Sequence, residues 1–388
     1  MRTEFEFYSP IKIVTGVGES QKLNKWVELF QANLVLVIVD GVVAKTDAFL
    51  AMTESMKEQG ISFDIFSDTI PEPPMELIDN LAAQVREKAY DLVIAVGGGS
   101  PMDTAKAVCM LKNNEGRIKE YLFGGSKTPK YPSVPLICIP TTAGSGSEVS
   151  CASVIEDTEE HIKLSCTHPN LYAKVAILDP LMQKGMPASV TAGTGMDAMT
   201  HAIESYTSKN SSVFTEMYAR KAIAIIAKHL PIAVKEPENL ESRMMMAQAS
   251  TMAAITMANG GLGAVHGISQ SMGGVAHTPH GITNAILLPK VMKYNYKGDM
   301  EKFADIAALL GVDTSEMTTE EAAQAAGKKI AEINAEIGIP DNITSLKVTK
   351  DMFPEIVKGT MGYRLLWMNP IPVSYTHLRA HETLSDLV

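Results

Sequence analysis

The chain has 388 residues, of which 46% are hydrophobic and 20% are charged, and its formal net charge is −10. This length allows two domains and a large core. The acidic balance disfavours nucleic acid or an anionic membrane surface as a partner. We therefore expect a cytoplasmic protein that binds neither nucleic acid nor membrane.

The cysteines and the N-terminal segment carry no redox or targeting signal. The four cysteines form no C-x-x-C pair, so we expect neither a zinc knuckle nor disulfides. Free cysteines are typical of a reducing compartment, which we therefore expect. Residues 1–14 lack the apolar core of a signal peptide. No run approaches the roughly 18 to 20 apolar residues that a membrane span needs.

The first half of the chain alternates strand and helix patterns. Apolar, β-branched runs that predict buried strands occur at 33–40, 91–100, 134–140 and 174–180, the second of which runs into glycines, and an alternating strand is expected at 62–68. Helical patterns separate several of these runs. Buried strands joined by helices predict a largely parallel sheet, so we expect an α/β domain over residues 1–185.

From residue 186 the pattern becomes helical. Long helical segments cover 214–234 and 241–261, and the second ends at glycines, which favour helix termination. Strand signals are scarce. The sequence therefore predicts an all-helical second domain over residues 186–388.

Three glycines stand where a predicted strand meets a predicted helix. Gly97, Gly98 and Gly99 end the strand, and Ser100 opens a helix with proline in its first turn. Glycine lets the backbone approach a phosphate closely, and a helix N-terminus offers unpaired N–H groups and a favourable dipole. The spacing is not G-x-G-x-x-G. A pyrophosphate site and a plain strand-to-helix turn are both compatible with this segment.

Two further segments favour dinucleotide binding. Asp40 ends the strand 33–40, where a carboxylate can accept hydrogen bonds from the ribose of NAD and would repel the 2′-phosphate of NADP. The segment 140–150, PTTAGSGSEVS, places hydroxyl groups and glycines after another strand. Hydroxyl groups and backbone amides at the carboxyl end of a sheet suit the ribose and phosphates of a dinucleotide.

One aspartate and three histidines are candidate metal ligands. Asp197 and His201 are four residues apart, so a helix places them on one face, with Glu204 one turn further as a partner for a ligand. His266 and His280 lie in a second apolar, glycine-rich segment. One carboxylate and three imidazoles suit a divalent first-row metal that keeps a position open for substrate.

The chain resembles the iron-containing, group III, alcohol dehydrogenases in four segments: GGGSPMDTAKA, PTTAGSGSEVS, GTGMDAMTHAIES and GLGAVHGISQSMGGVAHTPHGITNAILLP. The resemblance extends from about residue 5 to residue 370. It implies the dehydroquinate-synthase-like fold, with an NAD-binding α/β domain over 1–185 and a helical metal-binding domain over 186–388. It also implies an active site in the cleft between the two domains and a homodimer or higher homo-oligomer.

The resemblance assigns site residues as well. It implies four metal ligands, with Fe(II) as the usual ion and zinc or another divalent metal as alternatives: Asp197, His201, His266 and His280. It implies that NAD, or alternatively NADP, contacts a larger set: Asp40, Gly97, Gly98, Ser100, Asp103, Thr141, Thr142, Ser145, Ser147, Lys163 and Met182.

These residues predict a metal-dependent, NAD(H)-linked alcohol dehydrogenase. We expect hydride transfer between a small primary alcohol and NAD, with the metal polarising the substrate oxygen and with His266, His277 and His280 in the catalytic centre. One alternative is a metal- and NAD-dependent lyase or cyclase of the dehydroquinate synthase type, which needs clustered basic residues that 186–290 lacks. A metallohydrolase without a nucleotide is the other, and the glycine and hydroxyl segments disfavour it.

Two positions depart from the family pattern. Gln270 stands where many members have a histidine that is proposed to relay protons, and glutamine does not titrate near neutral pH. His277 or the ribose hydroxyls of the cofactor are candidates to serve instead. Glu72, in the stretch PEPP where many members have Pro-Asn-Pro, would place a carboxylate near the adenine end of the cofactor.

The C-terminal segment from about residue 371 is atypical. The segment GYRLLWMNP fits the family, whereas IPVSYTHLRAHETLSDLV does not continue as the amphipathic final helix that the resemblance implies. We infer that these last 18 residues are not native to the fold.

Truncation after Pro370 tests this inference. We expect the shortened chain to keep its dehydrogenase activity and its melting temperature, because the removed residues would contribute no packing. Activity assays and thermal unfolding of both lengths measure this. A large loss of either property would contradict the inference.

Overall fold

The computed structural model describes residues 3–158 and 162–374, so the tail beyond residue 374 lies outside the described residues. For the residues from 371 to 373 the expectation of a segment without packing is wrong, because Val373 packs against the helical core and the carbonyls of Ile371 and Pro372 accept hydrogen bonds from Asn369 and Tyr294. The described chain forms two compact units. The sheet unit contains residues 9–142 and 146–184. The helical unit contains the N-terminal residues up to 8, the short segment 143–145, and the chain from residue 185 onward.

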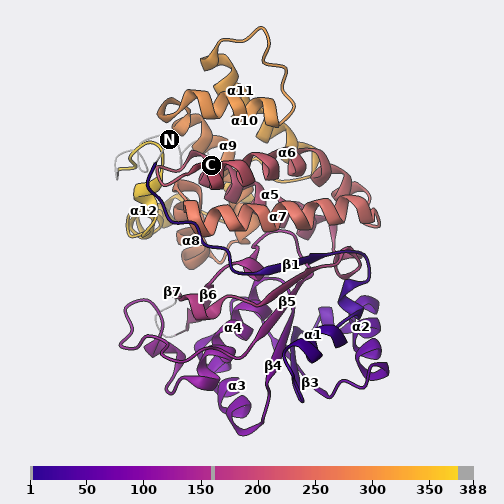
Figure 1. The fold of residues 1–388 in the computed structure, drawn as a ribbon. Helices are drawn as coiled ribbons and strands as arrows, with labels where there is room; N and C mark the ends of the chain where they lie inside the picture. The colour runs from indigo at the N-terminus through magenta and orange to yellow at the C-terminus, as the bar shows by residue number, and fades with distance from the viewer. Residues whose placement is uncertain (1–2, 159–161, 375–388) are drawn as a thin grey trace. The chain divides into compact units, whose positions relative to one another are not determined.

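Six parallel strands form the centre of the sheet unit (Figure 1). They lie in the order β1-β8-β5-β4-β2-β3, and every pair of neighbours is parallel. Their bounds are β1 (Lys12–Thr15), β2 (Val35–Asp40), β3 (Phe63–Thr69), β4 (Leu92–Gly97), β5 (Leu136–Pro140) and β8 (Val175–Leu178). The five strands that the sequence predicts are all present, and the short, largely exposed edge strand β1 is additional.

Helices cover both faces of this sheet. They are α1 (Asn24–Leu29), α2 (Asp47–Glu58), α3 (Met75–Glu87) and α4 (Gly99–Asn113). Because successive side chains of a strand point to opposite faces, Val35 and Val37 of β2 pack with α1 and α2, while Leu36 and Ile38 pack with α3 and α4. Burial on both faces explains why the strands are almost continuously apolar.

A hairpin that the sequence did not predict completes the sheet unit. β6 (Ala152–Asp157) and β7 (Ile162–Thr167) pair antiparallel, with Glu156 opposite Lys163. The Glu156 amide also donates to the Pro73 carbonyl at 3.0 Å, in the loop that follows β3. The hairpin is therefore fixed to that loop.

The helical unit packs its helices around one apolar core (Figure 1). They are α5 (Ala188–Thr207), α6 (Val213–Lys235), α7 (Leu240–Gly260), α8 (Ala264–Ala276), α9 (His280–Asn295), α10 (Met300–Leu309), α11 (Thr319–Glu336) and α12 (Phe353–Met361). None of the helices within 3–158 and 162–374 combines the length and the apolar character of a membrane span.

Two glycines let α5 and α9 cross closely. A Cβ atom added at Gly281 would lie 2.4 Å from the carbonyl oxygen of Gly193, and one added at Gly193 would lie 3.1 Å from the Ile282 side chain. Backbone therefore meets backbone at this crossing, one residue after His280 at the start of α9. The position of that histidine relative to α5 depends on the crossing.

Gly281→Ala is expected to push α9 away from α5. The added methyl meets backbone rather than a movable side chain, so we expect a loss of about 1–3 kcal/mol in the free energy of unfolding, together with a lower metal content. Gly274→Ala on α8 is the matched control, because its Cβ would meet nothing within 4 Å. We expect that variant to be unchanged or stabilised by up to about 1 kcal/mol. Urea unfolding and elemental analysis compare them, and equal behaviour of the two variants would contradict the crossing argument.

Candidate functional site

Helix α5 carries three polar side chains along one face inside the apolar core. Asp197, His201 and Glu204 follow the spacing i, i+4, i+7, and all three are buried. Buried ionisable groups are costly unless they pair with one another or hold a metal. This face therefore marks a site rather than a packing surface.

Two further helices bring histidines to this face. The Asp197 Oδ1 atom lies 3.7 Å from Nε2 of His201, 3.7 Å from Nε2 of His266 on α8, and 3.6 Å from Nε2 of His280 on α9. The rings of His201 and His266 stack with centroids 4.7 Å apart. One carboxylate thus faces three imidazoles that come from three helices.

Hydrogen bonds orient two of these rings. Glu204 Oε2 lies 2.6 Å from Nδ1 of His266, and its other oxygen accepts the amide of Val265 at 2.7 Å. Ser269 Oγ lies 3.1 Å from Nδ1 of His280. Both rings use Nδ1 for these contacts, so Nε2 points towards Asp197. Such outer partners are typical of histidines that ligate a metal.

Asn284 is a member of the cluster that the sequence analysis missed. It lies on α9 one turn after His280, and it is fully buried. Its Nδ2 donates to Asp197 Oδ1 at 2.7 Å and lies 3.2 Å from Nε2 of both His266 and His280. Its Oδ1 has no hydrogen-bond partner among the described residues. The spacing of four residues from His280 was the available signal.

The pKa values of the buried ionisable groups in the cluster depend on their charged neighbours as well as on burial. Burial opposes the charge of Asp197, but the surrounding histidines outweigh it and hold the pKa of Asp197 well below its usual range. Burial lowers the pKa of His201. At His266 burial also opposes the charge, yet Glu204 and Asp197 raise the pKa to about 9. The carboxylate is therefore ionised at neutral pH and attracts a cation.

The donor set fits a divalent metal. Asp197, His201 and His266 each offer one ligand atom, and these atoms lie within 4.8 Å of one another. Oxygen and nitrogen ligands bound at about 2.0–2.2 Å to one tetrahedral ion lie about 3–3.5 Å apart, which is close to the observed 3.6–3.7 Å. At these distances Asp197 Oδ1 and the imidazole nitrogens are too far apart to hydrogen-bond directly. The cluster is therefore arranged to share a cation.

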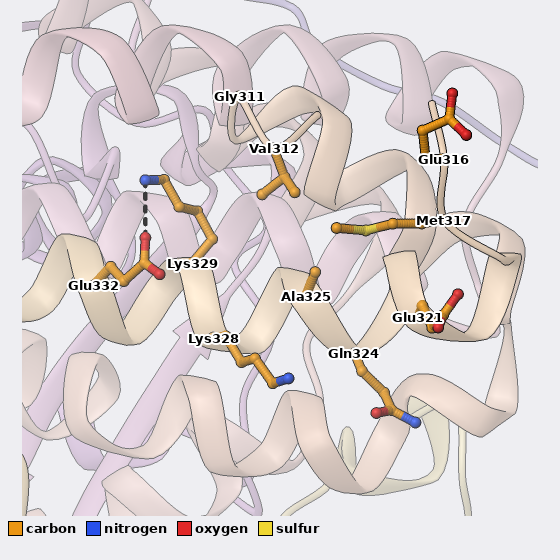
Figure 2. Close-up of a pocket in the computed structure, with 10 residues that line it drawn as sticks. All are labelled: Gly311, Val312, Glu316, Met317, Glu321, Gln324, Ala325, Lys328, Lys329 and Glu332. Carbon is orange, nitrogen blue, oxygen red and sulfur yellow. Dashed lines mark hydrogen bonds and ion pairs between the residues drawn. The ribbon is translucent and has the colours of Figure 1, made fainter. Parts of the chain in front are cut away.

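Other candidate positions lie outside this cluster. His277 is exposed and ends α8 in a left-handed conformation, with φ of 50°, and its catalytic role stays a prediction. Gln270 is exposed on α8. The cavity of about 550 Å³ beside α11 in Figure 2 is lined by none of the candidate ligands, so no function is assigned to it.

In the sheet unit, the glycine segment lies at the carboxyl ends of neighbouring strands. Gly97 ends β4 with φ of +149°, and a Cβ there would lie 2.6 Å from Pro101 and 3.4 Å from Asp40 Oδ2. A Cβ at Gly98 would lie 3.4 Å from Thr142 Oγ1. The Thr141 amide donates to the Gly97 carbonyl at 2.9 Å. The structure thus brings together candidates from the ends of β2, β4 and β5.

The carboxylate of Asp40 is fixed by the turn that follows it. Its Oδ1 accepts the amides of Val42 and Val43 at 2.9 and 2.8 Å. Its Oδ2 lies beside Gly97, at the entry to α4. This position suits a group that meets the ribose at the edge of a phosphate-binding turn.

Two candidates belong to a buried network under α4. Ser147 Oγ donates to Asp103 Oδ1 at 2.7 Å, and the fully buried Lys106 donates to Ser147 Oγ at 2.7 Å and to Ala152 O at 2.8 Å. Lys106 was not a candidate, although it stands three residues after Asp103. This network ties α4 to the segment that follows β5.

The remaining candidates occupy different surroundings. Met182 is buried in the core beneath the sheet, and Ser145 belongs to the helical unit. Ser100 and Lys163 both contact Glu72: the Glu72 amide lies 3.3 Å from Ser100 Oγ, and Lys163 Nζ lies 2.5 Å from Glu72 Oε1. Roles in cofactor binding stay predictions for all of them.

Comparison with known proteins identifies the family. The profile described as "Iron-containing alcohol dehydrogenase" matches residues 10–180, and the one described as "Fe-containing alcohol dehydrogenase family, C-terminal" matches residues 191–381. The chain belongs to the iron-containing alcohol dehydrogenase family. Choline dehydrogenase of Bacillus subtilis (strain 168) is 36% identical over 365 residues, covering 94% of this chain and 90% of that protein.

Solved structures agree with this family. The crystal structure of a 1,3-propanediol oxidoreductase has a TM-score of 0.93 and 33% identity, covering 97% of this chain and 98% of that one. The sulfoacetaldehyde reductase of Bifidobacterium kashiwanohense, solved in complex with NAD+, has a TM-score of 0.89 and 25% identity, covering 97% of each chain. The expected fold class and the oxidoreductase class are confirmed. The comparisons support the dehydrogenase and not the lyase or the hydrolase.

Glu204→Gln in this dehydrogenase is expected to weaken metal binding about 10- to 100-fold, because an amide keeps the size of the side chain but removes the charge that orients His266. Titration of metal-stripped protein against a competing chelator measures the dissociation constant. Glu301→Gln, at an exposed position in the first turn of α10, is the control, with an expected affinity equal to that of the unmodified chain. Equal affinities of all three proteins would show that Glu204 does not position His266.

Proposed function

We propose that the chain interconverts small primary alcohols and aldehydes, using NAD(H) and one divalent metal ion held by Asp197, His201, His266 and His280. The observation that carries this proposal is the convergence of three imidazole Nε2 atoms on one ionised carboxylate oxygen, at 3.6–3.7 Å, from three separate helices. A bound divalent ion supplies Lewis-acid polarisation of the substrate oxygen. We propose Fe(II) as the ion, with zinc or another divalent metal as an alternative.

The protein's own residues contribute position and charge. Asp197 stays ionised because imidazoles surround it, and it offers the single negative charge of the ligand set. Glu204 and Ser269 fix the rings of His266 and His280, so their Nε2 atoms need no reorganisation when a cation is bound. His280 is the most exposed ligand candidate, with 41% of its side chain accessible, so substrate would approach the site past its ring.

The sheet unit would hold NAD at the carboxyl ends of β2, β4 and β5. The nicotinamide supplies the hydride chemistry. Gly97 and Gly98 let the backbone approach the pyrophosphate, and the N-terminus of the 15-residue helix α4 offers amides and a favourable dipole. Asp40 would accept hydrogen bonds from the adenine ribose and disfavour the 2′-phosphate of NADP.

A cytoplasmic homodimer is the assembly that we propose. The four cysteines are free thiols and three of them are buried, which suits a reducing compartment. The dimer is supported by the resemblance to the family. Elemental analysis of the purified protein, combined with an anaerobic screen of alcohols and aldehydes followed by NADH absorbance, tests the proposed activity directly.

His266→Ala is expected to lose bound metal and turnover together, with at least about a hundredfold lower kcat/KM, because it removes a ligand and leaves the buried Glu204 Oε2 without its imidazole partner. His229→Gln, at a buried α6 histidine whose ring bonds Ser242, is the control and should keep both. Metal content and NADH formation are measured on the same preparations. Full turnover by metal-stripped protein would refute the proposed function.

A further inference from the structure

Glu72 lies at the entry to the proposed nucleotide site in an unusual backbone conformation. Its φ is 55°, in the left-handed region that non-glycine residues rarely adopt. Such a conformation is unfavourable for a residue with a Cβ atom and persists where surrounding contacts hold it. The contacts of this residue therefore indicate what its conformation serves.

Three contacts hold the Glu72 segment against elements of the proposed site. The Glu72 amide lies 3.3 Å from Ser100 Oγ, in the first turn of α4. The next residue, Pro73, accepts the amide of Glu156 from β6. The Glu72 carboxylate lies 2.5 Å from Nζ of Lys163 on β7. The left-handed turn thus presents the carboxylate to the hairpin and the amide to the phosphate-binding helix.

Lys163 matters because it is the only basic residue among the predicted cofactor-binding positions. A dinucleotide carries two phosphate charges, and an NADP molecule carries an additional 2′-phosphate. The side chains of Lys163 and Glu72 are 27% and 39% accessible, so solvent screens their attraction only in part. An anion that uses Lys163 has to compete with the carboxylate that already pairs with it.

We propose that Glu72 limits the affinity for the dinucleotide by competing for Lys163, and that it strengthens the preference for NAD over NADP. The inference rests on the proposed function, since it concerns the same nucleotide site. The Glu72 carboxylate imitates a phosphate oxygen at Lys163. It also adds a second negative charge to that of Asp40 at this edge of the sheet, which penalises the more highly charged cofactor more strongly.

Removing the charge of Glu72 tests the proposal. Glu72→Gln is expected to lower the dissociation constant of NADH about threefold to tenfold, and that of NADPH by a larger factor, with both gains shrinking at high ionic strength. Glu72→Gly, which also suits a φ of 55°, is expected to give the same gains and guards against a misfolded glutamine variant. Fluorescence titration of the purified protein with NADH and NADPH measures the constants.

Lys163 provides the decisive comparison. Lys163→Met should weaken both cofactors, and adding Glu72→Gln to it should change nothing further, because the competition no longer exists. Glu76→Gln, at a neighbouring carboxylate whose only hydrogen bond among the described residues is a 3.5 Å contact from Thr158, is the control that should leave both constants unchanged. Unchanged or weaker binding by Glu72→Gln, or an equal gain in the Lys163→Met background, would overturn the proposal.

The outcomes also separate this inference from the proposed function. If the unmodified protein binds neither NADH nor NADPH, the nucleotide site itself is refuted and the inference falls with it. If the unmodified protein binds NADH, and Asp40→Ser shifts the preference towards NADPH while Glu72→Gln changes nothing, the site stands and only the role of Glu72 is refuted.

Discussion

The negative charge of Asp197, buried inside a helical core, is the constraint on which the helical unit depends. A lone buried carboxylate would cost several kcal/mol, so the surrounding helices have to bring compensating groups. They do so from three directions, with His201 one turn further along α5, His266 on α8 and His280 at the start of α9. The close backbone crossing at Gly193 and Gly281 sets the separation of α5 and α9. The packing of these helices therefore also sets the distance between the candidate ligands that they carry.

A second layer of polar groups makes this arrangement specific. Glu204 bonds both the ring of His266 and the amide of Val265, so it fixes the side chain and the first turn of its helix together. Asn369, which follows α12, accepts the amide of Ala264 at 3.1 Å and exchanges two hydrogen bonds with Asn295 at the end of α9. The start of α8 is thereby held from two sides. A polar network of this kind stabilises most when all its members are satisfied, and among the described residues Asn284 Oδ1 is an exception in this cluster.

In the sheet unit, backbone groups rather than side chains form most of the proposed nucleotide-binding edge. Parallel strands end at one edge, and the turns after β4 and β5 approach each other closely because Gly97 and Gly98 carry no side chain. The buried side chain of Lys106 links α4 to the segment after β5 and to β6, because it donates to Ser147 Oγ and to the Ala152 carbonyl. In the proposed nucleotide site, recognition of the cofactor then depends on few charged groups, among them Asp40, Lys163 and Glu72.

The sequence by itself determined the elements and the ligand types. Apolar runs such as 33–40 and 91–97 are buried on both faces, so their composition alone predicted central parallel strands, and the i, i+4 spacing of Asp197 and His201 predicted one helical face. Only the tertiary structure decided which distant groups meet. Asn284 enters the cluster because α9 crosses α5 at two glycines, the β6–β7 hairpin carries Lys163 to Glu72, and Lys106 turns inward beneath α4. Periodicity records which face of a helix or strand is buried, but a contact between residues far apart in the chain depends on the packing of whole elements, which no local pattern encodes.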